Sequence, residues 1–315
     1  MPAPYDASQT LLLDQDFKKF ITPETFSTPP KEVSALDLSQ NNPHIKAIIT
    51  NFAVGVSEEI LEKLPNLEII SVFGVGVDRL PLQKAKERKL KITTTAGVNA
   101  DEVADTALML LLNLNRHFLG NVQWMENGSW VKIGEPPLGH SIKGSKVGIA
   151  GFGAIGKAIA ERLSVFGAEI RYFNRSAAQT AFKREDSIDS LADWADTLIL
   201  ALPGTQETQN IINENILKKL GANSVLINIA RGSLIDEKAL IEALKNKTIR
   251  GAGLDVFLNE PNINPAYLTL PNCVLQPHQG SATWETRQAM ACNVVQNLQA
   301  HFSKRALLTP LKGFA

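Results

Sequence analysis

Residues 146–156, KVGIAGFGAIG, decide the fold of this chain. The apolar run at 147–150 predicts a buried strand, and Gly151, Gly153 and Gly156 follow it. In such a series the first glycine makes a tight turn and the second lets backbone N–H groups reach a pyrophosphate. The third lets a helix pack closely on the strand. Because the pyrophosphate then meets the positive end of the helix dipole, the stretch predicts a dinucleotide-binding unit.

A glycine-rich loop can also be an ordinary turn. Here a stretch with helical periodicity, 155–166, and a second strand, 168–173, follow the glycines in the order that a dinucleotide site requires. This order favours cofactor binding over a simple turn.

The end of the second predicted strand indicates which dinucleotide is bound. An NAD site usually carries Asp or Glu there, accepting a hydrogen bond from the ribose 2′-OH. This chain has Asn174, Arg175 and Ser176 instead. Arg175 can make charge-assisted bonds to a 2′-phosphate, and its neighbours can add uncharged donors. The triplet favours NADP (NADPH) over NAD, the alternative being that Arg175 is a solvated arginine in a turn.

The composition is that of a globular protein. A length of 315 residues suits two domains, and 44% of the residues are hydrophobic and 20% charged. The 32 basic and 32 acidic side chains give a net charge of +0, which argues against nucleic acid or an anionic membrane as a partner. Cys273 and Cys292 are too few for a disulfide framework, and the five histidines show no metal-ligand spacing. We expect a cytoplasmic protein with no metal, signal peptide or membrane span.

Strands and helices alternate in two blocks, which predicts parallel sheets. The first block has strands near 11–13, 45–50, 67–73 and 92–95, and helices at 57–64 (capped by Ser57) and 82–90. A long helix is expected over 101–119. The second block has strands at 147–150, 169–173, 197–201, 225–229, 253–256 and 274–276.

The last helix, 285–302, has no sheet of its own and is expected to return to the first block. The fold class predicted is therefore α/β with two domains. A doubly wound Rossmann sheet (99–285) is inserted into a flavodoxin-like substrate domain (1–98 and 286–315).

Three residues of the second block are expected at the same edge of the predicted sheet. Arg231, Glu260 and His278 each follow the carboxyl end of a strand, the edge at which open parallel sheets bind ligands. Each alone has an ordinary explanation: a turn, a solvated loop, or a histidine bound to backbone. Together at the edge of a cofactor domain they indicate catalysis.

This combination of side chains suits hydride transfer to a 2-oxo acid. His278 would donate the proton to the keto oxygen, and Glu260 would hold its tautomer and favour the imidazolium. Arg231 offers a planar fork for the substrate carboxylate and can polarise the keto oxygen. A second glycine pair, in residues 73–78 (FGVGVD), lacks the third glycine of a nucleotide site. Its N–H groups could hold a carboxylate, or the segment could be a strand-ending turn.

From about Ile45 to its C-terminus the chain resembles the D-isomer-specific 2-hydroxyacid dehydrogenases, and among them the glyoxylate/hydroxypyruvate reductases. The motifs that carry the resemblance are residues 72–78, 99–106, 146–156, 202–203, 228–232, 253–257, 260–261 and 277–283.

The resemblance implies that Arg231, Glu260 and His278 form the catalytic set, and that Val75 and Gly76 bind the substrate carboxylate through their backbone, together with Arg231 and His278. It implies a cofactor site made of Thr106, Gly151, Gly153, Ala154, Ile155, Gly156, Asn174, Arg175, Ser176, Leu202, Pro203, Thr208, Ala230, Asp255 and Gly280. Arg175 stands where NADP-preferring members carry their phosphate-binding arginine. A homodimer is implied as well, with residues 124–130 either in the contact between subunits or packed within their own.

The expected function is the NADPH-dependent reduction of glyoxylate or hydroxypyruvate to a D-2-hydroxy acid. One alternative is a reductase of larger 2-oxo acids such as hydroxyphenylpyruvate, for which residues 51–55 and Trp284 could border the side-chain pocket. Another is a dinucleotide-sensing, corepressor-like binding protein, because such proteins can retain the catalytic set.

Overall fold

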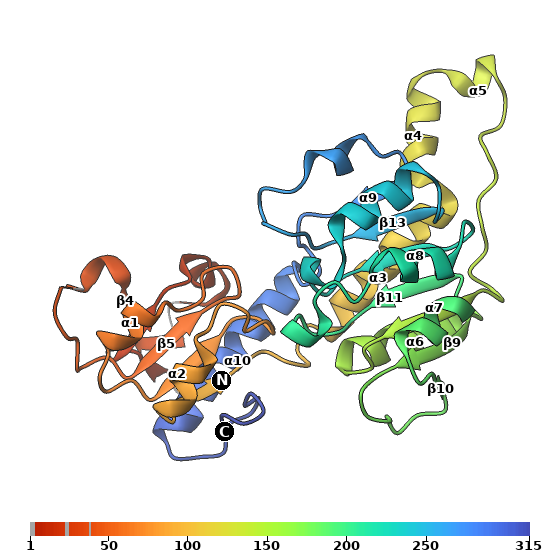
Figure 1. Ribbon diagram of the computed structural model, residues 1–315. Helices are drawn as coiled ribbons and strands as arrows, with labels where there is room; N and C mark the ends of the chain where they lie inside the picture. Colours follow the sequence, from red (N-terminus) through yellow and green to blue (C-terminus); the bar gives the residue numbers. More distant parts are fainter. Residues whose placement is uncertain (1–3, 23–24, 38) are drawn as a thin grey trace. The chain divides into compact units, whose positions relative to one another are not determined.

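The computed structural model describes residues 4–22, 25–37 and 39–315 (Figure 1). The chain divides into two compact units, one formed by Met1–Asn99 with Ala282–Ala315 and the other by Ala100–Ser281. The expected boundaries were 98/99 and 285/286; the observed ones are 99/100 and 281/282.

The second unit is built on a parallel sheet. Within the described residues it has seven strands in the order β10-β9-β8-β11-β12-β13-β14. The strands are β8 (Lys146–Ala150), β9 (Glu169–Phe173), β10 (Lys183–Arg184), β11 (Thr197–Leu200), β12 (Val225–Asn228), β13 (Gly251–Leu254) and β14 (Cys273–Leu275). In chain order this is 3-2-1-4-5-6 with one further strand, the doubly wound dinucleotide-binding order. The edge strand β10 was not predicted, because two residues leave no periodicity in a sequence.

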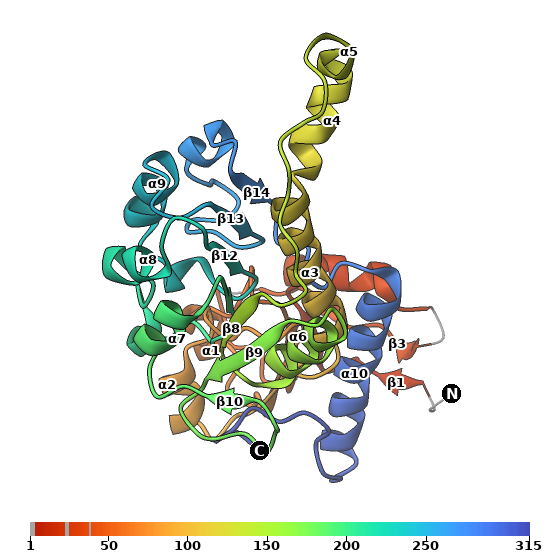
Figure 2. The same cartoon turned by 90° about the vertical axis from the view of Figure 1, so that its right-hand side faces the viewer.

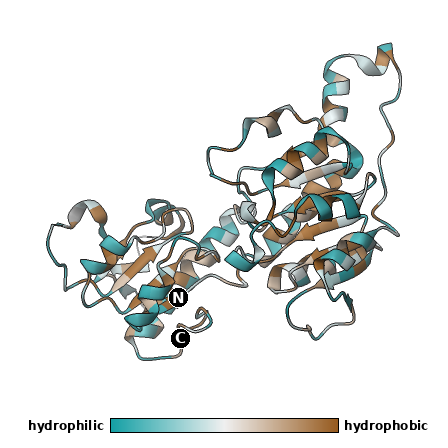
Figure 3. Ribbon diagram, viewed as in Figure 1, coloured by the Kyte–Doolittle hydropathy of each residue, from teal (hydrophilic) through white to brown (hydrophobic). Residues whose placement is uncertain are grey.

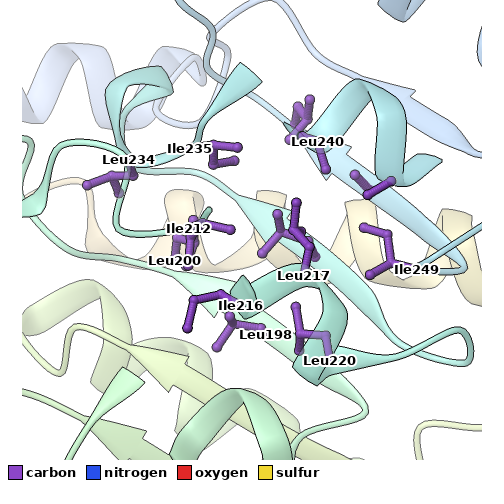
Figure 4. Packing of buried hydrophobic residues seen from close by; sticks show 14 of the residues in the cluster. Leu198, Leu200, Ile212, Ile216, Leu217, Leu220, Leu234, Ile235, Leu240 and Ile249 are labelled. Carbon is purple, nitrogen blue, oxygen red and sulfur yellow. The ribbon is translucent and has the colours of Figure 1, made fainter. Parts of the chain in front are cut away.

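Helices cover both faces of this sheet (Figure 2). They are α3 (Ala100–Arg116), α6 (Ala154–Val165), α7 (Ile188–Trp194), α8 (Glu214–Leu220) and α9 (Glu237–Lys245), with α4 (Phe118–Glu126) and α5 (Ser129–Lys132) projecting beyond the sheet. One apolar cluster joins α3 and α6 to the strands, and the other joins α7, α8 and α9. In the second cluster Leu217 and Leu220 of α8 pack beside Leu198 and Leu200 of β11 (Figure 4).

The helix expected over 101–119 is wrong in its last turn, because α3 ends at Arg116. The carbonyl of Asn115 accepts the N–H of His140 at 2.7 Å, so it is not used to continue the helix. His117 takes a left-handed conformation (φ 51°), and α4 begins after it. The helix therefore ends through a contact with a distant segment.

The first unit holds a parallel sheet of five described strands, in the order β4-β2-β5-β6-β7. These are β2 (Thr10–Leu12), β4 (Lys31–Glu32), β5 (Ala47–Thr50), β6 (Ile69–Val72) and β7 (Lys91–Thr93), and a separate ladder joins β1 (Tyr5–Asp6) to β3 (Phe26–Thr28). In chain order the larger sheet reads 2-1-3-4-5, which is the flavodoxin-like arrangement. Its short helices are α1 (Glu58–Glu62), α2 (Leu82–Glu87) and the 3₁₀ turns η1 (Gln15–Phe20) and η3 (Val33–Ala35).

The helix α10 (Trp284–Phe302) also packs on this first sheet. Its buried residues Met290, Val294 and Leu298 share an apolar cluster with Ile49 and Ile69.

The predicted N-cap of α1 is confirmed, since Ser57 Oγ accepts the Ile60 N–H at 3.2 Å. The central strands of both sheets are hydrophobic, as parallel strands covered on both faces require (Figure 3). The predicted α/β fold class is confirmed. Over the residues that the structure describes, no helix has the length and apolarity to cross a membrane.

Candidate active site

The glycine loop after β8 shows why three glycines are needed at this spacing. Gly151 has φ 97°, and a Cβ there would come closer than 3.0 Å to the Ala201 carbonyl. A Cβ on Gly156 would clash with the Gly151 carbonyl. Gly153, the N-cap of α6, has no atom within 4 Å of the position its Cβ would take. The protein itself thus requires the first and third glycines, while the second faces open space.

This open space lies at the N-terminus of a helix, where backbone N–H groups lack helical partners. Ala154 and Ile155 belong to the first turn of α6. The loop therefore fits the pyrophosphate of a dinucleotide. It has space at Gly153, and it offers backbone N–H donors and the positive end of the helix dipole.

The segment after β9 is tied to the glycine loop. Asn174 Oδ1 accepts the Phe152 N–H at 3.4 Å, and Asn174 Nδ2 donates to the Ser176 carbonyl at 3.0 Å. Arg175 is exposed, and its Nη1 lies 3.4 Å from Oε2 of Glu207. The segment predicted to face an adenosine 2′-phosphate thus carries a cation, with no carboxylate at the end of the strand.

Thr208, predicted to contact the cofactor, has a structural use in its own loop. Its Oγ1 donates to the Pro203 carbonyl at 2.7 Å and accepts the Thr205 N–H at 2.9 Å. These bonds fix the segment after β11, the strand beside β8. The other predicted cofactor residues outside the glycine loop and 174–176 follow carboxyl ends of strands, except for Thr106 in α3; they are Leu202, Pro203, Ala230, Asp255 and Gly280.

The structure brings two predicted catalytic residues into direct contact. His278 Nδ1 lies 2.6 Å from Oε2 of Glu260, and Glu260 Oε1 accepts the Phe257 N–H at 2.7 Å. Burial would raise the pKa of Glu260. The bond to His278, the Phe257 N–H and the charges of His278 and Arg231 outweigh burial and lower the pKa below its ordinary value. Glu260 is therefore a carboxylate at neutral pH.

The backbone of His278 is held by Asp255. The His278 N–H is shared between the carbonyls of Asp255 (2.8 Å) and Gln276 (3.1 Å), and His278 has φ 54°. The Asp255 carboxylate accepts the N–H groups of Gln279 (2.7 Å) and Gly280 (2.9 Å). Burial raises the pKa of Asp255 to about 6 in spite of these bonds. These hydrogen bonds between Asp255 and the backbone of residues 278–280 were not predicted from the sequence, which indicated only a cofactor role for Asp255.

Arg231 follows β12 and is half-buried at the same edge. Its Nη1 donates to the Ala230 carbonyl at 2.6 Å, and its own carbonyl accepts Asn228 Nδ2 at 2.8 Å. A Cβ on Gly232 would clash with the backbone of Phe257, so the loops after β12 and β13 pack directly on each other. Arg231, Glu260 and His278 thus follow three adjacent strands, β12, β13 and β14.

In the first unit, Val75 and Gly76 follow β6. Gly74 has φ 151°, its N–H donates to the Val72 carbonyl at 2.9 Å, and its carbonyl accepts the Thr95 N–H at 2.8 Å. In the described part of the chain, the N–H groups of Val75 and Gly76 make no hydrogen bond. They are two adjacent donors available to an anion.

Residues 108–280 match the family described as D-isomer specific 2-hydroxyacid dehydrogenase, NAD binding domain. The chain belongs to this family. It is 49% identical over 270 residues to 2-ketogluconate reductase of Gluconobacter oxydans, covering 85% of this chain and 87% of that one. It is 40% identical over 300 residues to glyoxylate/hydroxypyruvate reductase A of Arabidopsis thaliana, covering 95% of each.

A solved structure is similar over almost the whole chain. It is the NADPH-dependent glyoxylate/hydroxypyruvate reductase of Sinorhizobium meliloti in complex with NADP and malonate, with a TM-score of 0.88, 38% identity and 98% of each chain covered. This dehydrogenase is therefore an oxidoreductase with an NAD(P)-binding domain, which carries out NAD(P)-dependent reduction of 2-oxo acids.

Proposed function

We propose that this dehydrogenase reduces glyoxylate or hydroxypyruvate to the D-2-hydroxy acid with NADPH, and that His278 donates the proton. The observation that supports this most directly is the 2.6 Å contact between His278 Nδ1 and Glu260 at the edge that also carries Arg231. NADPH, when bound, supplies the hydride.

Each residue of the trio has a distinct part in this proposal. With Nδ1 bound to the Glu260 carboxylate, Nε2 of His278 gives its proton to the keto oxygen as negative charge grows there. The Glu260 carboxylate stabilises the imidazolium and fixes the ring. Arg231 binds the substrate carboxylate through its planar fork and polarises the carbonyl. Val75 and Gly76 supply two more donors to the substrate carboxylate.

The proposed cofactor site follows the same physical reasoning. The loop from Gly151 to Gly156 holds the pyrophosphate, and the space at Gly153 admits it. Arg175, with Asn174 and Ser176, binds the 2′-phosphate. The remaining proposed cofactor contacts are Thr106, Leu202, Pro203, Thr208, Ala230, Asp255 and Gly280.

A panel of substrates tests the proposal. Glyoxylate, hydroxypyruvate, 2-ketogluconate and hydroxyphenylpyruvate would each be measured with NADPH and NADH, and the product resolved by chiral chromatography. We expect the highest kcat/KM for glyoxylate or hydroxypyruvate with NADPH and a D product. A preference for NADH would overturn the proposed cofactor, and an L product would overturn the proposed stereochemistry. A higher kcat/KM for 2-ketogluconate or hydroxyphenylpyruvate would overturn the proposed substrate. Binding of NADPH without turnover of any 2-oxo acid would favour the alternative, a dinucleotide-sensing, corepressor-like binding protein.

One specific observation favours a second candidate substrate. The 49% identical relative is named a 2-ketogluconate reductase, and it covers most of this chain. Arg231, Glu260 and His278 would have the same roles with this longer 2-oxo acid. Its polyhydroxyl tail needs polar partners outside the reacting centre. The ratio of kcat/KM for 2-ketogluconate and hydroxypyruvate decides between the two.

We also propose a homodimer joined through the second unit. The arm formed by α4 and α5 exposes Met125, Trp130 and Val131, the last with 94% of its surface. Trp124 differs, because its Nε1 donates to the Gly134 carbonyl of the same arm at 2.9 Å. Exposed apolar surface of this kind is typical of an interface. Sedimentation of the wild type against Trp130→Asp with Val131→Asp tests it: we expect the variant to shift towards monomer.

A further inference from the structure

The short strand β10 carries an arginine that contacts the proposed 2′-phosphate segment. Arg184 Nε donates to the Asn174 carbonyl at 3.1 Å, and its Nη2 donates to the Arg175 carbonyl at 3.3 Å. One guanidinium therefore binds two successive carbonyls of the chain where it leaves β9. The register of β10 on β9 places Arg184 beside these carbonyls, because Arg184 pairs with Tyr172 of β9.

We propose that Arg184 is a specificity-determining residue for 2′-phosphorylated dinucleotides. It fixes the backbone that presents Arg175, and it adds a second positive charge beside it. The inference rests on the proposed use of NADPH and adds to it a residue that is remote in sequence from the 174–176 triplet.

The charge of Arg184 is not neutralised by an ion pair. Its two acceptors are neutral carbonyls, and no carboxylate of the described residues lies within ion-pair distance of it. By contrast, Arg175 already has Glu207 at 3.4 Å. A guanidinium has five N–H donors, so two bonds to carbonyls leave others for an anion. Arg184 can therefore hold the loop and contribute to a phosphate site at once.

The neighbouring residue of β10 provides a matched control. Side chains alternate along a strand, and Lys183 reaches Oε1 of Glu185 at 3.4 Å, on the other side from Arg184. Glu185 also accepts Arg171 Nη1 at 2.9 Å. Lys183→Gln and Arg184→Gln thus remove the same charge from the same two-residue strand, but only the second removes contacts to Asn174 and Arg175.

The test compares KM for NADPH and for NADH in the wild type, Arg184→Gln, Arg184→Lys and Lys183→Gln. We expect Arg184→Gln to raise KM for NADPH about tenfold, the scale of a lost charge-assisted contact, and to leave KM for NADH near the wild-type value. Arg184→Lys should give a smaller rise, because an ammonium keeps the charge without the planar fork. Lys183→Gln should match the wild type.

Calorimetric titration with adenosine 2′,5′-bisphosphate and with 5′-AMP gives a readout that needs no turnover. Arg184→Gln should weaken only the bisphosphate. A wild type that prefers NADH would overturn the cofactor proposal and this inference with it. A wild type that prefers NADPH, together with an Arg184→Gln variant that raises both KM values equally or neither, would overturn this inference alone.

Discussion

Glu260 is held at both carboxylate oxygens, one by His278 Nδ1 at 2.6 Å and the other by the Phe257 N–H at 2.7 Å. The carboxylate therefore cannot turn away from the imidazole without losing a backbone bond. A side chain anchored in this way fixes the orientation of its partner as well as its charge.

Glu260→Gln should keep the size of the side chain, remove its charge, and put an amide NH2 in place of one of the two accepting oxygens. In the proposed mechanism the imidazolium loses its counter-charge, so the kcat of reduction should fall. Steady-state measurements of kcat for the wild type, Glu260→Gln and His278→Ala test this. An unchanged kcat in Glu260→Gln would contradict a role for the charge of Glu260.

His278→Ala should reduce turnover by about 10²–10⁴-fold, the usual contribution of a positioned proton donor. NADPH affinity, measured by fluorescence titration, should stay close to that of the wild type. The two readouts separate loss of the acid from loss of the site. Retention of full turnover would refute the role of His278.

Arg175→Ala should raise KM for NADPH and leave KM for NADH almost unchanged. Its ion pair with Glu207 is exposed, with 79% and 77% of the two side chains accessible, so it contributes little and the arginine can turn to a phosphate. Glu207→Gln, which removes the competing carboxylate, should lower KM for NADPH modestly. If Arg175→Ala weakens both cofactors equally, the residue supports the loop and does not bind the phosphate.

Two glycines of the same loop should respond differently to alanine. Gly153→Ala should fold normally, because no atom lies within 4 Å of the new Cβ, yet it should weaken NADPH and NADH alike. Gly156→Ala should lower the melting temperature, since its Cβ would clash with the Gly151 carbonyl. Thermal melts and cofactor titrations of both variants give the comparison. Normal cofactor affinity in Gly153→Ala would contradict the proposed pyrophosphate position.

Asp255 should make stability depend on pH. Burial raises its pKa from 3.8 to about 6, so the folded protein keeps this proton to a higher pH than the unfolded chain does. The resulting stabilisation is complete below about pH 4 and is lost as the pH rises to about 6. Asp255→Asn does not titrate, so its deficit in melting temperature relative to the wild type should narrow across this range. A constant deficit would contradict the raised pKa.

Local signals account for what could be predicted from the sequence. The three glycines, the short apolar strands and the position of His278 after β14 are all properties of neighbouring residues, and parallel pairing places strand ends at one edge. The end of α3 could not be predicted, because it depends on the Asn115 carbonyl binding the distant His140 N–H. Arg184 was missed for a similar reason: only pairing with β9 brings it to residues 174 and 175.

The left-handed backbone at His278, with φ 54°, restricts which residue types can occupy that position. Asparagine, aspartate and histidine tolerate this region better than other residues with a Cβ, and branched side chains tolerate it worst. Among residues that can donate a proton, aspartate shares this tolerance with histidine. Directed evolution that searched for glutamate, cysteine, lysine or tyrosine here would therefore meet conformational strain before it met any chemical demand. The geometry of the main chain thus narrows the choice of proton donor in this place.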